Sequence, residues 1–335
     1  MSSNTRYSNF SAHLRKIVIG LGLVLLAGPT LAQGASSFPS RPVTVMVPYP
    51  PGQAADLLAR LMATELAKVW GQSVVVDNRG GGASIPGTMA GRNAAADGYT
   101  ITWGATGPIG VNPSLYPKLP YDPLADFAMV GGVFYTPMIF VAGAGAPYKN
   151  LADLVNAAKN NPGKLQIAYA GIGTAQHLTS ELFKARAGLE IEGVSYKGSG
   201  PAMTDLLGGH IQLLSDSTTA VLPYVQQGKI TALAVTSPQR MPQLPNVPTV
   251  AELGYPGFSG VGWGGFMVPK NTPADIVEKI GTDVRRILAD PAMQQRIIDR
   301  GGVADPRGSK EWTEFVRSEI SKWGEIVRKT NLKVD

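Results

Sequence analysis

The stretch VTVMVPYPPGQAADLLARLM (Val43–Met62) joins a short apolar run to a leucine-rich one through prolines, a glycine and small residues. VTVMV is typical of a buried strand, and the later leucines recur at the spacing of a helix. The prolines and Gly52 end the strand, and Gln53–Asp56 open the helix. Small residues let a ligand approach the backbone, so this stretch predicts a strand–loop–helix unit with a binding loop.

The same alternation of strand and helix continues along the chain. Strands are predicted at SVVVDN (73–78) and YTITWG (99–104), and a second series holds LQIAYAG (165–171), EGVSYKG (192–198) and IQLLSDS (211–217), with helical patterns between them. This order predicts an α/β protein with mainly parallel sheets flanked by helices. A chain of 335 residues suits two domains. Ligands of such sheets bind at the carboxyl ends of the strands.

The N-terminus has the pattern of a secretory signal. Arg6, Arg15 and Lys16 precede the uncharged run IVIGLGLVLLA, and Thr30–Ala32 supplies small residues for cleavage. This predicts a signal peptide at 1–32, cleaved near Ala32, and an exported protein in the periplasm. An uncleaved N-terminal anchor is the alternative, although the run is short for a membrane span.

Composition excludes several classes of function. The predicted signal removes three basic residues, leaving 27 basic against 24 acidic residues, so a net charge of +3 does not favour nucleic-acid binding. The chain has no Cys and three His, which excludes a Cys nucleophile and the usual zinc sites. Gly260, Gly262 and Gly265 fit a dinucleotide fingerprint, but a predicted strand follows them instead of a helix. We predict no metal, no cofactor and no enzymatic activity.

Loops rich in small residues follow six of the predicted strands. They are PPGQAAD (50–56), RGGGASIPG (79–87), GATGPIG (104–110), GIGTAQH (171–177), KGSG (197–200) and SDSTTA (215–220). Free N–H groups at a helix start favour an anion, and hydroxyl and amide side chains add neutral hydrogen bonds. Any single loop of this kind is often only a turn or a helix cap. Together, six of them predict a polar cleft between two domains that holds an anionic ligand.

These residues also carry a family resemblance. The segments FPSRPVTVMVPYPPGQAADLLAR (38–60), NPSLYPKLPYDPLADF (112–127) and PGKLQIAYAGIGTAQHLTSELFKARAG (162–188) resemble the receptors of tripartite tricarboxylate transporters, the Bug family. YKGSGPAMTDLLGGHIQLLSD (196–216) extends the likeness. The resemblance implies a two-domain periplasmic-binding-protein fold of the Venus-flytrap type that closes on a small carboxylate. Domain one would comprise 36–138 and 257–335, and domain two 139–256.

The resemblance also implies which residues bind the ligand. In the family, the first βα loop of each domain holds one carboxylate, and ordered waters bridge it to domain one. Carried over by position, the expected site residues are Tyr49, Gly52, Gln53, Ala54, Ala55, Asp56, Ser84, Ile85 and Thr106 from domain one, Gly171, Gly173, Thr174, Ala175, His177, Ser199 and Asp216 from domain two, and Trp263 near the crossover. Alternatively, His177 makes structural hydrogen bonds, Trp263 is ordinary core, and Asp216 only orients its loop.

One position departs from the family pattern. The family usually has two glycines after the prolines, whereas this chain has Gly52-Gln53. The Gln53 side chain either reaches a polar group of the ligand or points outward. We therefore expect a monomeric solute-binding protein that delivers a mono- or dicarboxylate to membrane transporter subunits. The alternative is a sensor component that presents the bound solute to a membrane signalling protein.

Overall fold

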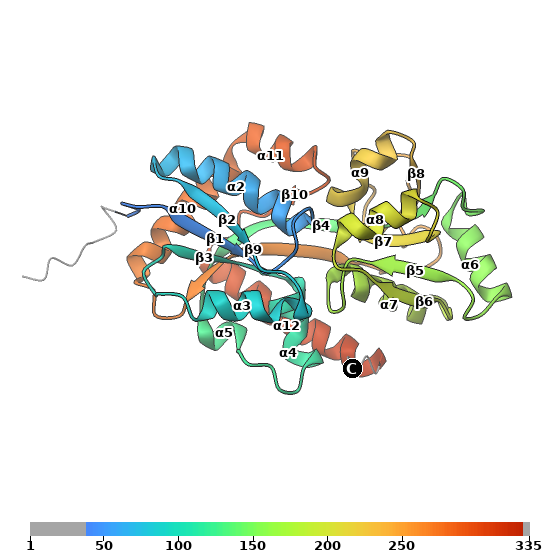
Figure 1. Ribbon diagram of the computed structural model, residues 1–335, viewed down its shortest axis with the longest axis horizontal. Coiled ribbons are helices and arrows are strands. Elements are labelled where there is room, and N and C mark those ends of the chain that lie inside the picture. Colours follow the sequence, from blue (N-terminus) through green and yellow to red (C-terminus); the bar gives the residue numbers. More distant parts are fainter. Residues whose placement is uncertain (1–37, 331–335) are drawn as a thin grey trace, which may run out of the picture. The chain divides into compact units, whose positions relative to one another are not determined.

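The computed structural model of the protein describes residues 38–330, and the predicted signal peptide with its cleavage site lies outside the described residues. From Pro39 onward the chain forms one compact unit of helices around a mixed sheet of ten strands (Figure 1). Across residues 38–330, no helix combines the length and apolarity needed to cross a bilayer.

The first sheet region contains the strand–loop–helix unit predicted around Gly52. Strands β1 (Val43–Val47), β2 (Val74–Asn78) and β3 (Thr100–Ala105) pair in parallel in the order β2-β1-β3. They alternate with α2 (Ala54–Trp70) and α3 (Ile85–Arg92). These helices lie on opposite faces of the sheet in Figure 1.

The second sheet region repeats this design. Strands β5 (Gln166–Tyr169), β6 (Glu192–Ser195) and β7 (Leu213–Ser217) pair in parallel in the order β6-β5-β7. The helices of this region are α6 (Leu151–Asn160), α7 (Ala175–Ala187), α8 (Ser199–Leu207) and α9 (Thr218–Gln226), and β8 (Ile230–Val235) follows them. The apolar side chains of α6 and α7 pack with Phe140 and Phe258 into one core cluster.

Two long strands connect the regions. β4 (Phe127–Gly143) pairs with β9 (Val261–Pro269) and β10 (Val303–Ala304) along its first part and with β7 and β8 along its last part, always antiparallel. β9 also pairs antiparallel with β3. The prediction of mainly parallel sheets therefore holds for the strands β2-β1-β3 and for the strands β6-β5-β7. The strands between these two groups are antiparallel, because the chain crosses between the regions in both directions. The sheet is continuous through β4, and the domain boundaries given above stay a prediction.

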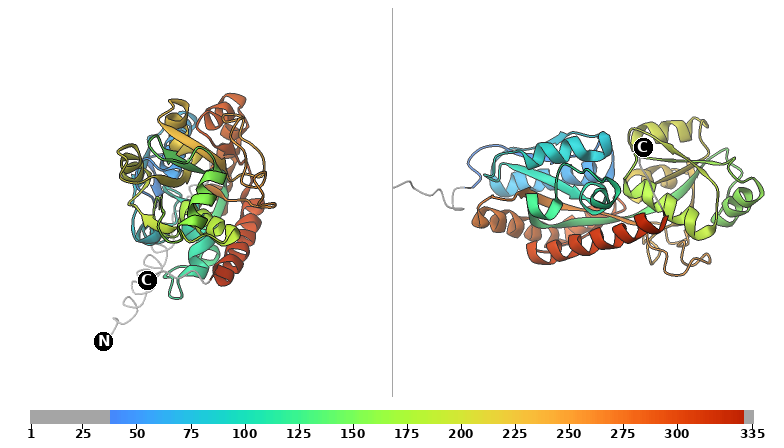
Figure 2. Two further views of the ribbon diagram at one scale, coloured as in Figure 1. Left: turned by 90° about the vertical axis from the view of Figure 1, so that its right-hand side faces the viewer. Right: turned by 90° about the horizontal axis from the view of Figure 1, so that it is seen from below.

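The C-terminal helices cover the first region. They are α10 (Ala274–Ala289), α11 (Pro291–Ile298) and α12 (Ser309–Thr330), and α12 runs along the underside of the sheet in Figure 2. Short helical segments complete the chain: η2 (Gly82–Ser84), η3 (Thr106–Val111), α4 (Asn112–Leu115) and α5 (Pro123–Asp126). Trp312 and Trp323 of α12 are fully buried. Trp312 meets Trp263 of β9 edge-to-face with ring centroids 5.4 Å apart.

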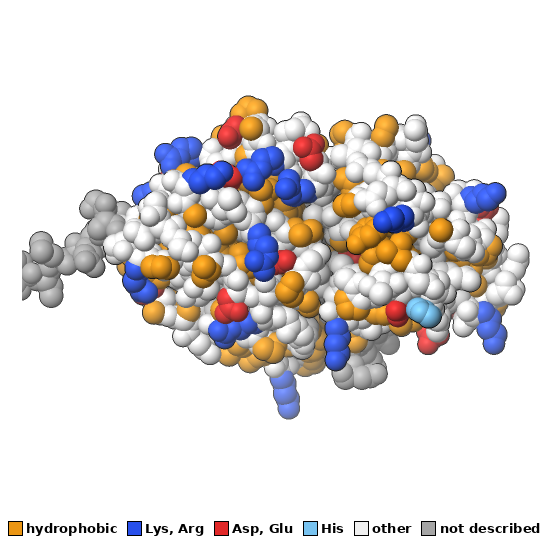
Figure 3. All heavy atoms as spheres, turned by 45° about the horizontal axis from the view of Figure 1, so that its top comes forward, with side chains coloured by type: hydrophobic (Ala, Val, Ile, Leu, Met, Phe, Trp, Pro, Cys, Tyr) orange, Lys and Arg blue, Asp and Glu red, His pale blue; other side chains and the backbone are white. Residues whose placement is uncertain are grey.

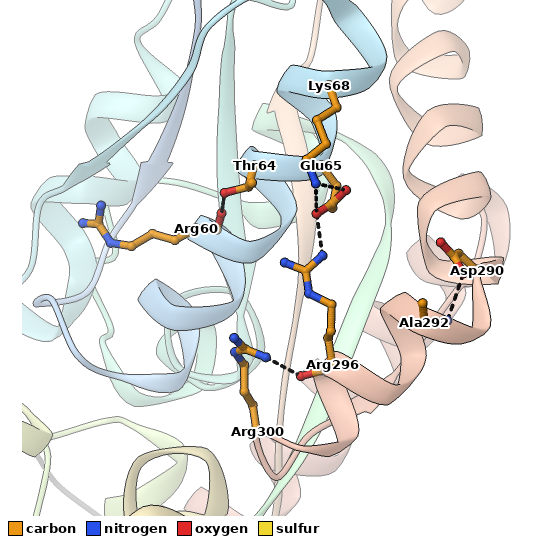
Figure 4. Close-up of polar contacts among 8 residues, drawn as sticks. All are labelled: Arg60, Thr64, Glu65, Lys68, Asp290, Ala292, Arg296 and Arg300. Atoms are coloured by element: carbon orange, nitrogen blue, oxygen red, sulfur yellow. Dashed lines mark hydrogen bonds and ion pairs between the residues drawn. The ribbon is translucent and has the colours of Figure 1, made fainter.

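Charged side chains join α2 to α11 at the surface. Basic side chains are frequent over these helices on the face in Figure 3, with acidic ones between them. Glu65 of α2 accepts from both Lys68 and Arg296, and Arg300 donates to the Arg296 carbonyl (Figure 4). Lys68 and Arg296 are thus paired with an acidic side chain, and Arg300 with a backbone carbonyl. This surface is therefore not uniformly basic.

Candidate functional site

The starts of α2 and α7 meet at a small inner cavity. Ala54 and Ala55 come from the first turn of α2, and Ala175 and Gln176 from the first turn of α7. The cavity has a volume of about 40 Å³, room for about three water-sized groups. Its lining consists of Tyr49, Gln53, Ala54, Ala55, Trp103, Ala105, Thr106, Phe134, Thr136, Met138, Ala175, Gln176, Ser217, Gly262 and Trp263.

The N-terminus of α2 leaves its amides free. Gln53 is the N-cap residue, with extended backbone angles (φ −77°, ψ 161°), but its side chain makes no capping hydrogen bond. Asp56 turns back to accept the Gly52 N–H at 2.8 Å and pairs with Arg60 at 2.8 Å. The first N–H groups of a helix have no acceptor within the helix. For Ala54 and Ala55, no other residue in 38–330 supplies one.

The N-terminus of α7 is arranged in the same way. Thr174 is the N-cap residue, and its Oγ1 accepts from the His177 N–H at 3.3 Å and donates to the Gly171 carbonyl at 2.7 Å. The amides of Ala175 and Gln176 find no acceptor among the described residues. Two helix starts therefore direct free N–H groups and the positive ends of two helix dipoles at one cavity, which favours an anion.

Trp263 and Thr106 form one wall of the inner cavity. The Trp263 backbone N–H donates to Thr106 Oγ1 at 2.9 Å, which joins β9 to the loop after β3. The Trp263 indole donates to Glu319 Oε2 at 2.6 Å, and this contact fixes the ring against α12. Trp103 adds a buried indole N–H that has no partner among the described residues. The wall is therefore rigid and mostly apolar.

An outer cavity of about 730 Å³ adjoins the inner one, since Tyr49 and Gln53 line both. Its other walls are Pro50, Pro51, Gly80–Ser84, Tyr116, Ala170–Ile172, Thr174 and Ser195–Gly198. Tyr116, Tyr196 and Ile172 give it an apolar character, and Lys197 carries the sole charge among the described lining residues. The outer cavity has room for the part of a ligand that lies beyond its anionic group.

Comparison with known proteins identifies the family. A model described as tripartite tricarboxylate transporter family receptor matches residues 58–332. The chain belongs to this family. Protein BugT of Bordetella pertussis is 36% identical over 318 residues, covering 95% of this chain and 97% of BugT.

Solved structures agree with this assignment. The receptor is similar to R. palustris Rpa4515 with adipate, with 33% identity, a TM-score of 0.86 and coverage of 88% of this chain and 99% of that one. It is also similar to MatC (Rpa3494) from Rhodopseudomonas palustris with bound malate. The identity is 32%, the TM-score is 0.81, and the match covers 87% of this chain and 100% of MatC. The predicted periplasmic-binding-protein fold is confirmed.

The hydroxyl of Tyr49 stays a neutral donor at the junction of the two cavities. Burial raises the pKa of Tyr49 above its ordinary value, and interactions with the Ser84 side chain and the Gly107 backbone oppose this only in part. Ser84 is held in a left-handed conformation (φ 66°), as is Ala83 (φ 51°), whose carbonyl accepts from Asn112 Nδ2 at 2.9 Å. The loop after β2 is thus pinned beside the outer cavity.

Two residues of the α7 loop have a structural role in the receptor. The Gly173 N–H donates to His177 Nδ1 at 3.2 Å, so the expectation that this amide binds ligand needs correction. Gly173 has φ +76°, which side chains rarely adopt. His177 lines neither cavity and packs against Tyr169, with ring centroids 4.5 Å apart and ring planes tilted by 41°. The alternative reading of His177, as a structural residue, fits this geometry.

The stability of the receptor should fall below pH 6.5 because of His177. Burial lowers the pKa of His177 from 6.5 to about 4, although Glu181 opposes the shift. The folded state therefore keeps His177 neutral while the unfolded chain binds a proton, so the contribution of His177 is complete above pH 6.5 and is lost toward pH 4. We expect urea unfolding to show about 1.5 kcal/mol less stability at pH 5 than at pH 6.5 from this group.

His177→Gln, which cannot titrate, is the matched variant for this measurement. Its stability should vary less between pH 6.5 and pH 5 than that of the unchanged protein. Identical slopes for both proteins would contradict a buried neutral His177.

The structure brings part of the predicted site together. Of the predicted residues, Tyr49, Gln53, Ala54, Ala55, Thr106, Ala175 and Trp263 line the inner cavity, and Ser84, Gly171 and Thr174 line the outer one. Gly52, Asp56, Ile85, Gly173, His177, Ser199 and Asp216 line neither. Asp216 lies behind Gln176 and accepts its Nε2 at 3.0 Å, and burial raises the pKa of Asp216. That these seven residues bind the ligand stays a prediction.

Sequence reasoning missed several lining residues. The inner cavity adds Trp103, Phe134, Thr136, Met138, Gln176 and Ser217, and the outer cavity adds Tyr116 and Ile172. Gln176 stands within the predicted GIGTAQH loop and could have been found there. Phe134, Thr136 and Met138 sit on the crossing strand β4, whose path no local pattern revealed.

Proposed function

We propose that the receptor is a periplasmic solute-binding protein that captures a small organic carboxylate and delivers it to a tripartite tricarboxylate-type membrane transporter. One observation carries this proposal: the free amides of Ala54, Ala55, Ala175 and Gln176 surround one cavity. A carboxylate there would accept hydrogen bonds from both sheet regions at once, and its binding would favour their closed arrangement.

Further support comes from charge and from relatives. Among its described lining residues, the inner cavity has no basic side chain, so main-chain amides would have to bind the anion. The similar proteins Rpa4515 and MatC were solved with adipate and with malate, which are carboxylates. We further propose that the receptor acts as a monomer, is exported after cleavage near Ala32, and performs no chemistry on its ligand.

The proposal is tested with acids and their matched amides. An ionised acid should stabilise the receptor, whereas its amide places NH₂ donors against donor amides and lacks the charge. Acid at 100 times its dissociation constant adds about 2.7 kcal/mol to the stability, and this raises the melting temperature by several degrees. The measurement is a thermal shift over a panel of mono- and dicarboxylates, with small-angle scattering of any complex.

Two outcomes would contradict parts of the proposal. Equal thermal shifts with acid and amide would overturn anion capture by helix N-termini. An acid that binds without reducing the radius of gyration would overturn closure but leave carboxylate binding in place.

A further inference from the structure

Two residues that line the inner cavity carry a side-chain acceptor with no donor among the described residues. The first is the carboxamide oxygen of Gln53, a residue that is 3% exposed and lines both cavities. Its Nε2 donates to the Ala170 carbonyl at 3.2 Å. A carbonyl only accepts, so this contact fixes which end of the carboxamide is the nitrogen. The oxygen neither caps α2 nor receives a hydrogen bond from another described residue.

The second acceptor is the carboxamide oxygen of Gln176, a residue that is 6% exposed. Its Nε2 donates to Asp216 Oδ1 at 3.0 Å. That same oxygen also accepts the Ser217 N–H at 2.7 Å, so it is an acceptor whatever the protonation of the other oxygen of Asp216. Gln176 therefore cannot turn around without placing oxygen against oxygen. Its own oxygen has no donor within residues 38–330 and is left on the side away from Asp216.

These contacts give the cavity two kinds of polar group. Four main-chain amides donate, and two fixed carboxamide oxygens accept. A plain carboxylate satisfies the donors but offers nothing to the acceptors. A ligand that displaces water from the cavity without offering a donor would leave these oxygens unpaired, so a ligand with a donor close to its carboxylate is favoured. The volume of about 40 Å³ accommodates about three polar groups, as in a carboxylate with one substituent on the next carbon.

We infer that Gln53 and Gln176 select carboxylates that carry a hydroxyl or ammonium group on the carbon beside the carboxylate. This inference rests on the proposed function and narrows its substrate class. Asp216 acts as a positioning residue, because it holds the Gln176 carboxamide in the orientation that presents the oxygen. The remaining part of such a ligand would extend past Tyr49 into the outer cavity.

The test compares acids that differ in one substituent. Calorimetry is performed with three trios, each with hydrogen, hydroxyl or ammonium on the second carbon: propionate, lactate and alanine; succinate, malate and aspartate; 3-phenylpropionate, 3-phenyllactate and phenylalanine. In the trio whose skeleton fits the outer cavity, the hydroxy or amino member should bind about tenfold or more tightly than the unsubstituted acid. Comparing the hydroxy acid with the amino acid of the same trio shows which donor, hydroxyl or ammonium, is preferred.

Variants identify the residues responsible. Gln176→Leu and Gln53→Leu remove the acceptors at similar volume, and each should reduce severalfold the ratio between the affinities for the substituted and the unsubstituted acid of the same trio, a ratio in which any loss common to both acids cancels. Gln226→Leu, at the exposed end of α9, is the control and should keep the full preference. Unfolding curves without ligand establish that each variant is folded.

The outcomes separate this inference from the proposed function. If acids bind but the unsubstituted member is equal or better in every trio, or if the preference survives both substitutions, the inference is overturned and carboxylate capture stands. If no acid binds while the protein is folded, both are overturned.

Discussion

Replacing Ala175 by proline is expected to weaken carboxylate binding by roughly 10- to 100-fold while leaving the fold intact. Proline removes the N–H that Ala175 directs at the inner cavity, and a hydrogen bond to a charged group contributes about 1.5–3 kcal/mol. Ala54→Pro at the start of α2 should have a similar effect. The double variant should lose most of the affinity, which calorimetry with the best-binding acid would measure.

The local backbone suits this substitution. Ala54 and Ala175 are each the first residue of their helix, where proline is well tolerated because the N–H has no partner within the helix. The preceding residues, Gln53 and Thr174, are extended with ψ near 160°, which is the conformation favoured before proline. By contrast, Gly173→Pro would lose the bond to His177 and cannot adopt φ +76°, so it would disturb the loop itself.

Ala274→Pro is the matched control. Ala274 is also the first residue of a helix, α10, but it is exposed and lines neither cavity. The Ala274→Pro variant should have the same affinity for the acid and the same melting temperature as the unchanged protein. If Ala54→Pro and Ala175→Pro bind acid as tightly as the control does, the carboxylate does not bind at the helix starts.

Replacing Glu319 by leucine is expected to lower the stability by about 3–5 kcal/mol. Glu319 is 6% exposed and accepts from the Trp263 indole at 2.6 Å, from the Trp323 indole at 3.0 Å and from Lys322. Leucine would leave two buried indole N–H groups without acceptors, each at a cost of about 1–3 kcal/mol. It would also leave Lys322 without its partner. Denaturant unfolding monitored by tryptophan fluorescence measures the loss.

Two further variants make this result specific. Glu319→Gln keeps one acceptor oxygen, which in the place of Oε2 accepts from both indoles and gives up only the contact with Lys322, so it should lose less stability than leucine does. Glu314→Leu, on the exposed side of the same helix, should stay within about 0.5 kcal/mol of the unchanged protein. Equal stabilities for Glu319→Leu and Glu314→Leu would show that Glu319 does not hold Trp263 in place. Ligand affinity should follow the stability loss, because Trp263 lines the inner cavity.

Local patterns in the sequence were sufficient to predict the helices, most strands and the position of the binding loops. The run from Val43 to Met62 predicts β1 and α2 because burial and helical spacing are visible within one segment. The same holds for the loop from Gly171 to His177 before α7. Small residues at these junctions predicted an anion site, and Ala54, Ala55 and Ala175 do line the inner cavity.

Only the tertiary structure decided which groups of those loops are available. A glycine in a loop predicts close approach, but the Gly173 amide is occupied by His177 four residues later. Gln176 looked like an ordinary polar residue until its contact with Asp216, 40 positions away, fixed its carboxamide. Likewise, Thr136 and Trp103 reach the cavity through β4 and β3. The sequence alone determined the elements and their loops, because helix and strand preferences are local. It left open which donors and acceptors stay free, because that depends on partners that only packing brings within hydrogen-bond distance.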